Sequence, residues 1–455
     1  MIEARLSELA ASLDTRLIKG DAAFVGVSTD SRAVKPGELF VALRGERFDA
    51  HDYVAQAQAA GAAAAVVERE LTLELPQLVC LDTLEALGRI ARLWRERTHA
   101  RVVGITGSNG KTTVKTLAAS ILARGFRCHV NAGNLNNEIG LPISLLRMPA
   151  HTEVAVLEMG AGKPGDIAYL ADIARPDIGL VNNVAAAHLA RMGTLDGVAE
   201  TKGAIYSALP PDGVAIVNAD CAYAERFVRL AGSRRIVRYA LDRSADVTAR
   251  IRTLGASTRF ELIVGAGTLD VDLPLPGRHN VRNALAAAAL ALAAGASLAA
   301  IKSGLEQVQG VAGRLTRHAL PSGATLIDDS YNANPGSVRA AIDTLALEPG
   351  ERWLVLGNMA ELGAGAEQLH AEAGAYARAI GIDRLVTVGT LAARASEGFG
   401  TNAEHHATHD GAIESLRAHL PGAATVLVKG SRSSTMEKVV NALIGRSNGG
   451  TAHAA

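Results

Sequence analysis

The segment from residue 102 to residue 113 constrains the fold more than any other part of this chain. It reads Val-Val-Gly-Ile-Thr-Gly-Ser-Asn-Gly-Lys-Thr-Thr, an apolar start followed by a glycine turn, a lysine and two hydroxyl residues. A strand that turns into a helix in this way points backbone N–H groups at a phosphate, and glycine lets the backbone come close. Lys111 would reach the terminal phosphates, and the hydroxyl of Thr112 or Thr113 would ligate Mg²⁺. The segment predicts a nucleoside triphosphate site in an α/β fold.

The glycine pattern of this segment departs from the usual phosphate loop. Ile105 stands at the first glycine position, and Gly107 is an additional glycine. A glycine turn that binds nothing is the simpler alternative. The Lys-Thr-Thr run directly after Gly110 favours the phosphate loop over that alternative.

Composition limits the possible partners. The chain has 46 Lys and Arg against 46 Asp and Glu, and only 4% aromatic residues, which disfavours a nucleic-acid translocase or a charged membrane surface. Its three cysteines are far apart in the sequence, which is typical of reduced thiols in a cytoplasmic protein. The apolar run 284–300 is broken by Gly295, so we interpret it as a core helix and expect no membrane span.

Strand-like and helix-like runs alternate along the chain, which predicts an α/β protein of three domains. We expect a small α/β domain over residues 1–82, a doubly wound, mostly parallel ATPase-like sheet over 83–315, and a Rossmann-like domain over 316–446. Residues 447–455 are small and polar, and they predict a disordered tail. The expected strands are 24–27, 39–43, 64–67, 102–106, 154–158, 178–182, 214–218, 325–328, 353–356, 385–388 and 425–428, with a hairpin at 260–264 and 269–273.

Three polar residues of the second domain are candidates for chemistry. Glu158 ends an expected strand, so its carboxylate can complete a Mg²⁺ shell at the ligand-binding edge of the sheet, although an exposed strand-end acid is the simpler alternative. His188 follows another strand, but a lone histidine is more often structural. Lys202, expected near a helix start, is either a surface lysine or, after CO₂ uptake by its neutral amine, a carbamate that holds a second Mg²⁺.

These motifs occur in the order found in the Mur ligases, and the chain resembles that family over nearly its whole length. In the first domain, Ser28-Thr-Asp-Ser-Arg32 and residues 36–43 resemble the uridine-nucleotide contact region of the family. The Asp-Asn-Pro-Arg signature of the diaminopimelate-adding ligase is absent, which favours the member that acts last. The matching segments are 107–113, Glu158-Met-Gly, Asn183, His188, Lys202, Gly277-Arg-His279-Asn280-x-x-Asn283, Arg314, 327–337 and 356–363.

The resemblance implies a monomeric, ATP-dependent ligase of peptidoglycan precursor synthesis. It would join D-alanyl-D-alanine to UDP-N-acetylmuramoyl-tripeptide through an acyl phosphate, with ATP and two Mg²⁺. Lys111, Glu158, His188 and Lys202 would be catalytic. The metal ligands would be Thr112, Thr113, Glu158, His188 and carbamylated Lys202.

The resemblance also implies binding residues. The ATP contacts would be Gly107, Ser108, Asn109, Gly110, Lys111, Thr112, Thr113, Asn280, Asn283, Arg314 and Asp329. The contacts to the other substrates would be Ser31, Arg32, Asn332, Lys429, Ser431 and Arg432, with His51 as a weaker candidate.

Several of these residues have simpler interpretations. Asn280 and Asn283 could cap a helix, and Arg314 and Asp329 could form salt bridges between domains. Lys429-Gly-Ser431-Arg432 could be a solvated basic turn. If Arg314 and Asp329 do complete the site from the third domain, the enzyme must close in order to react.

The chain departs from the family pattern at two positions. Ala50 stands where Gly often occurs before His51, and Ala186 stands where Pro often occurs.

Two other functions are also compatible with the sequence. One is a sibling or folylpolyglutamate-synthase-like ligase that adds a single amino acid, and the other is a nucleotide-gated binding module.

Overall fold

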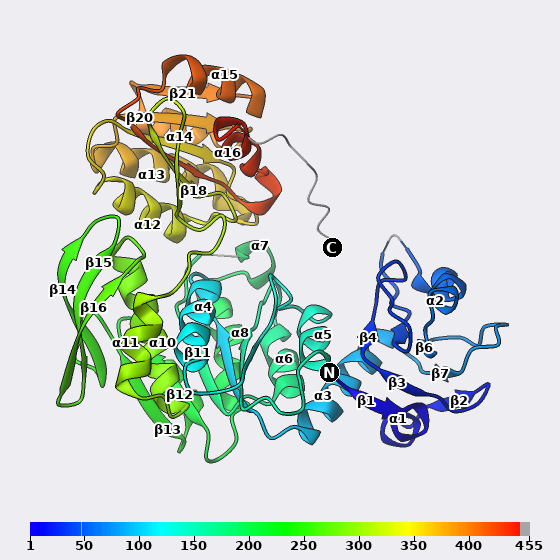
Figure 1. Cartoon of the computed structure of the whole chain (residues 1–455). Helices are drawn as coiled ribbons and strands as arrows, with labels where there is room; N and C mark the ends of the chain where they lie inside the picture. The colour runs from blue at the N-terminus through cyan, green and yellow to red at the C-terminus, as the bar shows by residue number, and fades with distance from the viewer. Residues whose placement is uncertain (47, 187, 446–455) are drawn as a thin grey trace.

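The computed structural model describes residues 1–46, 48–186 and 188–445 of the chain. These residues form three α/β regions that follow one another along the sequence (Figure 1). We call them the N-terminal, middle and C-terminal regions, and they carry a five-stranded, a nine-stranded and a six-stranded sheet. The tail predicted at 447–455 lies outside the described residues. The predicted domain boundaries at 82/83 and 315/316 remain a prediction.

The N-terminal region contains the five-stranded sheet, in the order β2-β7-β6-β5-β4, and a separate β1-β3 pair. Pairing is parallel from β4 to β7 and antiparallel between β7 and β2. The expected strand at 24–27 is two strands, β3 and β4. The elements are β1 (Glu3–Arg5), α1 (Leu6–Leu13), β2 (Arg16–Ile18), β3 (Ala23–Val25), β4 (Val27–Ser28), β5 (Leu39–Val41), α2 (Val54–Ala59), β6 (Ala64–Val67) and β7 (Gln77–Val79).

The middle region is built on the nine-stranded sheet, in the order β16-β15-β14-β13-β12-β11-β8-β10-β9. All pairs from β9 to β14 are parallel, and β15 and β16 form the expected hairpin, which joins the sheet through antiparallel pairing with β14. The strands are β8 (Arg101–Thr106), β9 (Cys128–Val130), β10 (Val154–Glu158), β11 (Ile178–Val181), β12 (Val214–Asn218), β13 (Arg235–Tyr239), β14 (Val247–Leu254), β15 (Thr258–Val264) and β16 (Gly267–Leu273).

Helices cover both faces of this sheet because neighbouring residues of its strands point to opposite sides. In β8, Val102 packs in the core with α3, α5, α6, α8 and α9, whereas Val103 packs in the core with α4, α10 and α11. The helices are α3 (Thr83–Arg97), α4 (Lys111–Leu122), α5 (Gly140–Leu146), α6 (Asp166–Ala174), α7 (Leu189–Met192), α8 (Leu195–Ser207), α9 (Ala224–Ala231), α10 (Arg278–Ala293) and α11 (Leu298–Glu306).

The sequence predicts one helix over the apolar run 284–300. The structure instead has parts of two helices there. Helix α10 ends at Ala293, and α11 begins at Leu298 after a turn in which Gly295 has a φ of +96°. The Ser297 side chain caps α11 by accepting from the Ala300 N–H. The core placement is confirmed for the first part of the run, where every residue from Ala284 to Ala291 is buried, but it is wrong for the second part, where Ser297 to Ala299 are exposed.

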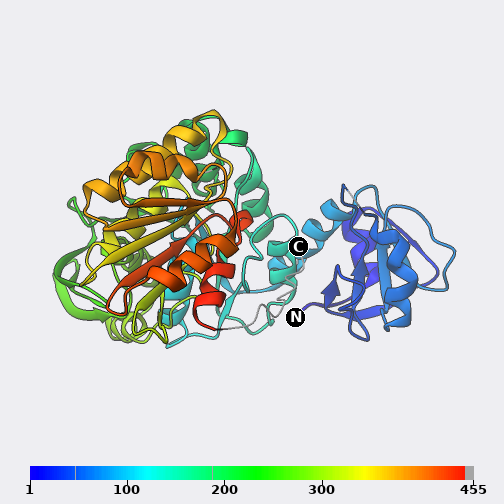
Figure 2. The same cartoon turned by 90° about the horizontal axis from the view of Figure 1, so that it is seen from above.

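The C-terminal region has the sheet order β17-β18-β22-β19-β20-β21, with only β17 antiparallel. Figures 1 and 2 show this region against the middle region, while the N-terminal region lies to one side. Within the described residues, no helix has the length and apolar character needed to cross a bilayer. The elements are β17 (Thr316–Ala319), β18 (Thr325–Asp329), α12 (Pro335–Leu345), β19 (Arg352–Gly357), α13 (Ala366–Ala379), β20 (Arg384–Val388), α14 (Ala393–Phe399), β21 (Ala403–His406), α15 (His409–His419), β22 (Thr425–Lys429) and α16 (Glu437–Leu443).

Candidate active site

A cavity of about 1090 Å³ lies where the middle and C-terminal regions meet. The middle region contributes residues 108–113, Glu158 and His188 to its lining. The C-terminal region contributes Asp329 and Lys429, at the ends of two parallel strands. The carboxyl ends of strands from both sheets therefore face the same cavity, as expected for open α/β sheets.

The turn between β8 and α4 has the backbone that its glycines predict. Gly107 and Gly110 have φ values of +149° and +76°. A Cβ on Gly110 would lie 2.5 Å from Asn283 Oδ1, so a side chain does not fit there. Lys111 Nζ donates to the Gly107 carbonyl at 2.9 Å, and burial lowers the pKa of Lys111. The first-turn amides of α4 have no acceptor within their own helix, which leaves them for an anion.

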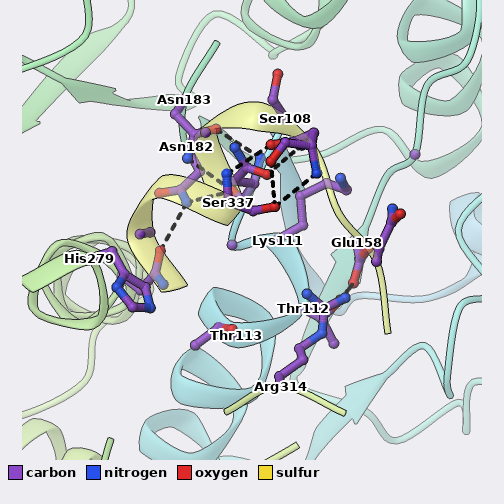
Figure 3. Close-up of a pocket in the computed structure, with 18 of the residues that line it drawn as sticks. Ser108, Lys111, Thr112, Thr113, Glu158, Asn182, Asn183, His279, Arg314 and Ser337 are labelled. Atoms are coloured by element: carbon purple, nitrogen blue, oxygen red, sulfur yellow. Dashed lines mark hydrogen bonds between the residues drawn. The ribbon is translucent and has the colours of Figure 1, made fainter. Parts of the chain in front are cut away.

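Two asparagines after β11 hold this turn, and the sequence analysis did not include them among the site residues. Asn183 accepts from two amides of the turn, Ser108 N at 3.0 Å through its carbonyl and Asn109 N at 2.8 Å through Oδ1. Asn182 Nδ2 donates to the Asn109 carbonyl and to Asn283 Oδ1 (Figure 3). The signal for them was their position directly after a buried strand at the ligand-binding edge.

Glu158 is a buried group and not an exposed strand-end acid, so that simpler interpretation is wrong. Its Oε2 accepts from the Thr112 hydroxyl at 2.8 Å, and its Oε1 accepts from Asn136 Nδ2 at 2.7 Å. Arg314 Nη2 donates to the same Thr112 oxygen at 3.0 Å (Figure 3). Lys115 Nζ lies 3.7 Å from Glu158, a neighbour that the sequence motif did not indicate.

Lys202 lies within α8 and not at a helix start, and its side chain is among the largest fully buried ones. The surface-lysine interpretation is therefore wrong. Burial, with the nearby Lys111 charge, lowers the pKa of Lys202 to about 7, while Asp166 opposes this shift. A substantial fraction of Lys202 is thus a neutral amine near neutral pH, the form that reacts with CO₂.

His188 lines the same cavity, but the structure pairs it with Glu361 of the C-terminal region and not with Glu158. It precedes α7 with a φ of 55°. Burial lowers the pKa of His188, and the Glu361 charge opposes this effect. Glu361 lies in the segment 356–363 that resembles the family, but no role was predicted for it.

Asn280 and Asn283 do not cap their helix, because Gly277 occupies the N-cap position of α10. Both asparagines are buried in the cavity wall, and Asn283 Nδ2 donates to Asn280 Oδ1 at 3.1 Å. His279 lies beside them, and burial lowers its pKa to about 4. This wall therefore presents uncharged polar groups.

Arg314 and Asp329 do not form the salt bridges between regions that their simpler interpretation suggests. The Arg314 guanidinium lies 4.5 Å from the Tyr331 ring centroid, and its Nε is buried without a hydrogen-bond partner among the described residues. Asp329 pairs at 2.5 Å with Lys429 on the neighbouring strand of its own sheet. Burial raises the pKa of Asp329, and Lys429 opposes this effect.

The segment 429–432 is only partly a solvated turn. Lys429 and Ser431 are buried, and the Ser431 hydroxyl donates to the Asn358 carbonyl at 2.7 Å. Arg432 keeps 54% of its side chain exposed. The solvated interpretation therefore holds for Arg432 alone.

Asn332 and Asn334 lie in the turn before Pro335, which begins α12. Asn332 lines the cavity, and its carbonyl accepts from Lys429 Nζ. Asn334 is the N-cap of α12 and accepts from the Ser337 amide. Its Nδ2 also donates to Asn109 Oδ1 at 2.7 Å, which is a contact between the C-terminal and middle regions.

The uridine-nucleotide candidates lie in the N-terminal region and do not line this cavity. Ser31 donates to Gln56, and Arg32 pairs with Asp30 at 2.8 Å. His51 is buried between Asp49, to which Nδ1 donates, and the Glu68 amide, from which Nε2 accepts. Ala50 begins a 3₁₀ turn without a positive φ, so the absence of glycine there strains nothing.

The donor set of the cavity fits a nucleotide with magnesium. The Thr112 hydroxyl and the Glu158 carboxylate are oxygen ligands, and Mg²⁺ is usually held by one or two carboxylates together with substrate phosphates. The orphaned Arg314 Nε is a further donor suited to a phosphate oxygen. Within the part of the chain that the structure describes, no three His, Cys, Asp or Glu side chains group as a metal site.

Comparison with protein-family models finds three matches, the first two of which overlap. The model described as "Mur ligase family, catalytic domain" matches residues 23–120, and "Mur ligase middle domain" matches residues 105–291. The model described as "Mur ligase, glutamate ligase domain" matches residues 313–432.

Individual relatives match over nearly the full length. The chain is 47% identical to UDP-N-acetylmuramoyl-tripeptide–D-alanyl-D-alanine ligase of Escherichia coli, over 97% of this chain and 99% of that protein. A crystal structure of MurF from Acinetobacter baumannii superposes with a TM-score of 0.93 at 37% identity, covering 98% of this chain and 100% of that one. The structure of MurF ligase from Thermotoga maritima with ADP gives a TM-score of 0.84 at 27% identity, covering 92% and 97%.

Proposed function

This chain belongs to the Mur ligase family, and we propose that it joins D-alanyl-D-alanine to UDP-N-acetylmuramoyl-tripeptide with ATP, in peptidoglycan precursor synthesis. It is an ATP-dependent amide-forming ligase. The observation that carries the proposal is the identity of 47% over 97% of the chain to a relative with this activity. The phosphate-loop cavity supplies the site for the chemistry.

The proposed reaction has two steps. The terminal carboxylate of the tripeptide attacks the γ-phosphorus of ATP, and ADP leaves, which forms an acyl phosphate. The amine of D-alanyl-D-alanine then attacks the acyl carbon, and the tetrahedral intermediate expels phosphate. Phosphate is a far better leaving group than the oxide that an unactivated carboxylate would have to release. The protein contributes positioning and charge neutralisation.

The chain's own residues suit the first step. Lys111 and the first-turn amides of α4 would hold the terminal phosphates. Arg314 Nη2 donates to the Thr112 hydroxyl, which supports a contact of its guanidinium with the transferred phosphoryl group. Asn280, Asn283 and Asp329 are proposed contacts of the adenosine.

Magnesium fits this site, and we propose Thr112, Thr113, Glu158, His188 and carbamylated Lys202 as its ligands. Bound Mg²⁺ would neutralise charge between the γ-phosphate and the attacking carboxylate. Thr112 and Glu158 already lie together in the cavity wall. The lowered pKa of Lys202 supports carbamate formation, because only the neutral amine reacts with CO₂.

The other substrates are proposed to contact both the N-terminal region and the C-terminal side of the cavity. Ser31 and Arg32 would contact the uridine nucleotide, and Asn332, Lys429, Ser431 and Arg432 would contact the peptide substrates. Since Lys429 is already paired with Asp329, its role would include orienting that carboxylate. We further propose a monomer in the cytoplasm, which agrees with three free cysteines.

Phosphate release with defined substrates tests the function. Purified protein, ATP and Mg²⁺ are combined with each muramoyl acceptor and each amine in turn. The proposal predicts release only with the UDP-muramoyl tripeptide and D-alanyl-D-alanine together. Release with a single amino acid would favour a sibling ligase, and ATP turnover independent of any amine would favour a nucleotide-gated module.

A further inference from the structure

We propose that Glu361 is a positioning residue that fixes the ring of His188 and does so only while the C-terminal region is docked on the middle region. This inference rests on the proposed function for its catalytic consequence, but not for its structural content. Glu361 lies in the segment between β19 and α13, and His188 lies in the segment between β11 and α7. Nothing in the chemistry above assigns Glu361 a role.

Two further contacts accompany the ion pair. The Glu361 carboxylate pairs with His188 Nδ1, and the Glu361 carbonyl accepts from the Ala190 amide at 3.4 Å. Gly363 lies against the same turn, since a Cβ placed on it would be 3.7 Å from Ala190 Cα. Figure 1 shows α7 at the surface of the middle region that faces the C-terminal region. The segment therefore docks as a unit on the residues that follow His188.

The segment that carries Glu361 is held rigidly from its own side. The ring of His370 is completely buried, and its Nε2 accepts from the Met359 amide at 2.8 Å. Asn358 Oδ1 accepts from the Ala392 amide at 2.8 Å. Glu361 itself has a φ of 62°, a left-handed conformation that costs a non-glycine residue about 1 kcal/mol or more. Such strain persists only where surrounding contacts enforce it.

The pairing determines which ring nitrogen of His188 is available. A carboxylate can only accept, so in a neutral imidazole Nδ1 must carry the proton and Nε2 must carry the lone pair. A carboxylate on the far nitrogen is also the arrangement that orients histidine ligands and makes them more basic. Glu361 would thus prepare Nε2 as a ligand or acceptor.

Glu361 and His188 belong to different regions, so their ion pair depends on docking of the C-terminal region. The ring of His188 is held by Glu361 only when the C-terminal region is in place. Docking therefore completes the site on the middle region, even though Glu361 is not expected to touch substrate.

The first test observes the ring in the unliganded full-length protein. Long-range ¹H–¹⁵N spectra of ¹⁵N-histidine-labelled protein above neutral pH distinguish the tautomers, and the spectrum of His188→Gln assigns the signal. We expect an Nδ1–H tautomer in the wild type and a mixed or Nε2–H pattern in Glu361→Ala. Glu361→Gln serves if the alanine variant does not fold, because its amide can donate as well as accept. An unchanged tautomer in both variants would overturn the proposal.

The second test is kinetic and uses a matched control. Glu361→Ala should lower kcat by about 10-fold to 100-fold while KM for ATP stays within about twofold, the pattern of a lost orienting carboxylate. Glu361→Asp should recover part of kcat. The control is Glu367→Gln, which removes an exposed carboxylate a few residues away and should match the wild type. An unchanged kcat in Glu361→Ala contradicts the positioning role. If the wild type forms no peptide bond, the proposed function fails, but the tautomer result still stands.

Discussion

The two ends of the molecule attach to the middle region in different ways. The N-terminal region shares one continuous hydrophobic core with the middle region, which includes Ile2 and Leu78 on one side and Leu145 and Trp94 on the other. The two cores of the C-terminal region contain only its own residues. At the cavity, polar side chains link this region to the middle region.

These polar contacts converge on the active site. Arg314 donates to Thr112, Asn334 donates to Asn109, and Glu361 pairs with His188. Each such contact contributes only about 1 kcal/mol, or somewhat more when a charge is involved. An apolar interface fixes two domains, whereas a polar one leaves relative motion as the default. We therefore expect the N-terminal region to be a fixed platform and the C-terminal region to be the part that closes.

The phosphate loop belongs entirely to the middle region, so removal of its lysine should cause the largest fall in turnover. Lys111→Ala removes the ammonium from the phosphate site and should reduce ATP-dependent turnover by about 10³-fold or more. Phosphate release measures this effect. Lys302→Ala, which removes an exposed lysine of α11, is the control and should behave as the wild type. Normal turnover in Lys111→Ala would refute the assignment.

The free energy of unfolding should distinguish the attachment of the N-terminal region from that of the C-terminal region. Ile2→Ala truncates a side chain in the shared core and should lower the free energy of unfolding by about 2–4 kcal/mol. Asn334→Ser keeps a capping side chain on α12 but removes the contact to Asn109, and should cost less than about 1 kcal/mol. Urea denaturation followed by circular dichroism compares them. Equal losses in the two variants would show that the attachments do not differ.

Substitution of Lys202 tests whether its buried amine forms a carbamate that holds Mg²⁺. Lys202→Ala should lower ligation by about 100-fold or more, since a misplaced metal costs several kcal/mol of charge stabilisation. Bicarbonate or a short carboxylic acid should restore part of the activity by replacing the carbamate oxygens. The same acids should not restore Lys111→Ala. Unimpaired turnover in Lys202→Ala would exclude the carbamate role.

Arg314 depends on docking of the C-terminal region, so its loss should be milder than that of Lys111. Arg314→Lys keeps the charge but loses the planar fork and the stacking on Tyr331, and should lower kcat by about 10-fold. Arg317→Lys is a control within the same region, where the arginine pairs with Glu348 away from the cavity. Equal kcat values for Arg314→Lys and the wild type would show that Arg314 does not contact the transferred phosphoryl group.

The smallest expected effect is a change of shape. Small-angle scattering should show a slightly smaller radius of gyration when an ATP analogue and both other substrates are present. Asn334→Ser and Glu361→Ala should weaken this compaction, and Ile2→Ala should not. A radius of gyration that is independent of ligands would contradict closure.

The sequence predicted well what lies in one continuous segment. The strand, turn and helix around Gly110 follow from local glycine geometry, and the position of Glu158 follows from where its strand ends. Both depend on steric rules that act over a few residues. The functional residues implied by the family resemblance also came from continuous motifs, and their roles remain a prediction.

Contacts between distant segments were not predictable in this way. Nothing near Glu361 indicates that it meets His188. The position of Asn183 after a strand places it at the ligand-binding edge, but it does not indicate that Asn183 holds the amides of the phosphate loop. The burial of Lys202 depends on packing of α8 against its neighbours, which lysine's usual preference for the surface does not reveal. The prediction of a single helix over 284–300 was wrong because the alanine-rich pattern continues through the turn at Gly295.

Transfer of ¹⁸O from the acceptor carboxylate to phosphate tests the proposed acyl-phosphate step directly. The tripeptide acceptor is prepared with ¹⁸O in its terminal carboxylate and converted with ATP, Mg²⁺ and D-alanyl-D-alanine. If the carboxylate attacks the γ-phosphorus, one labelled oxygen leaves with every phosphate released, and mass spectrometry will find it there. Phosphate that carries no label while the peptide bond still forms would contradict the acyl-phosphate route.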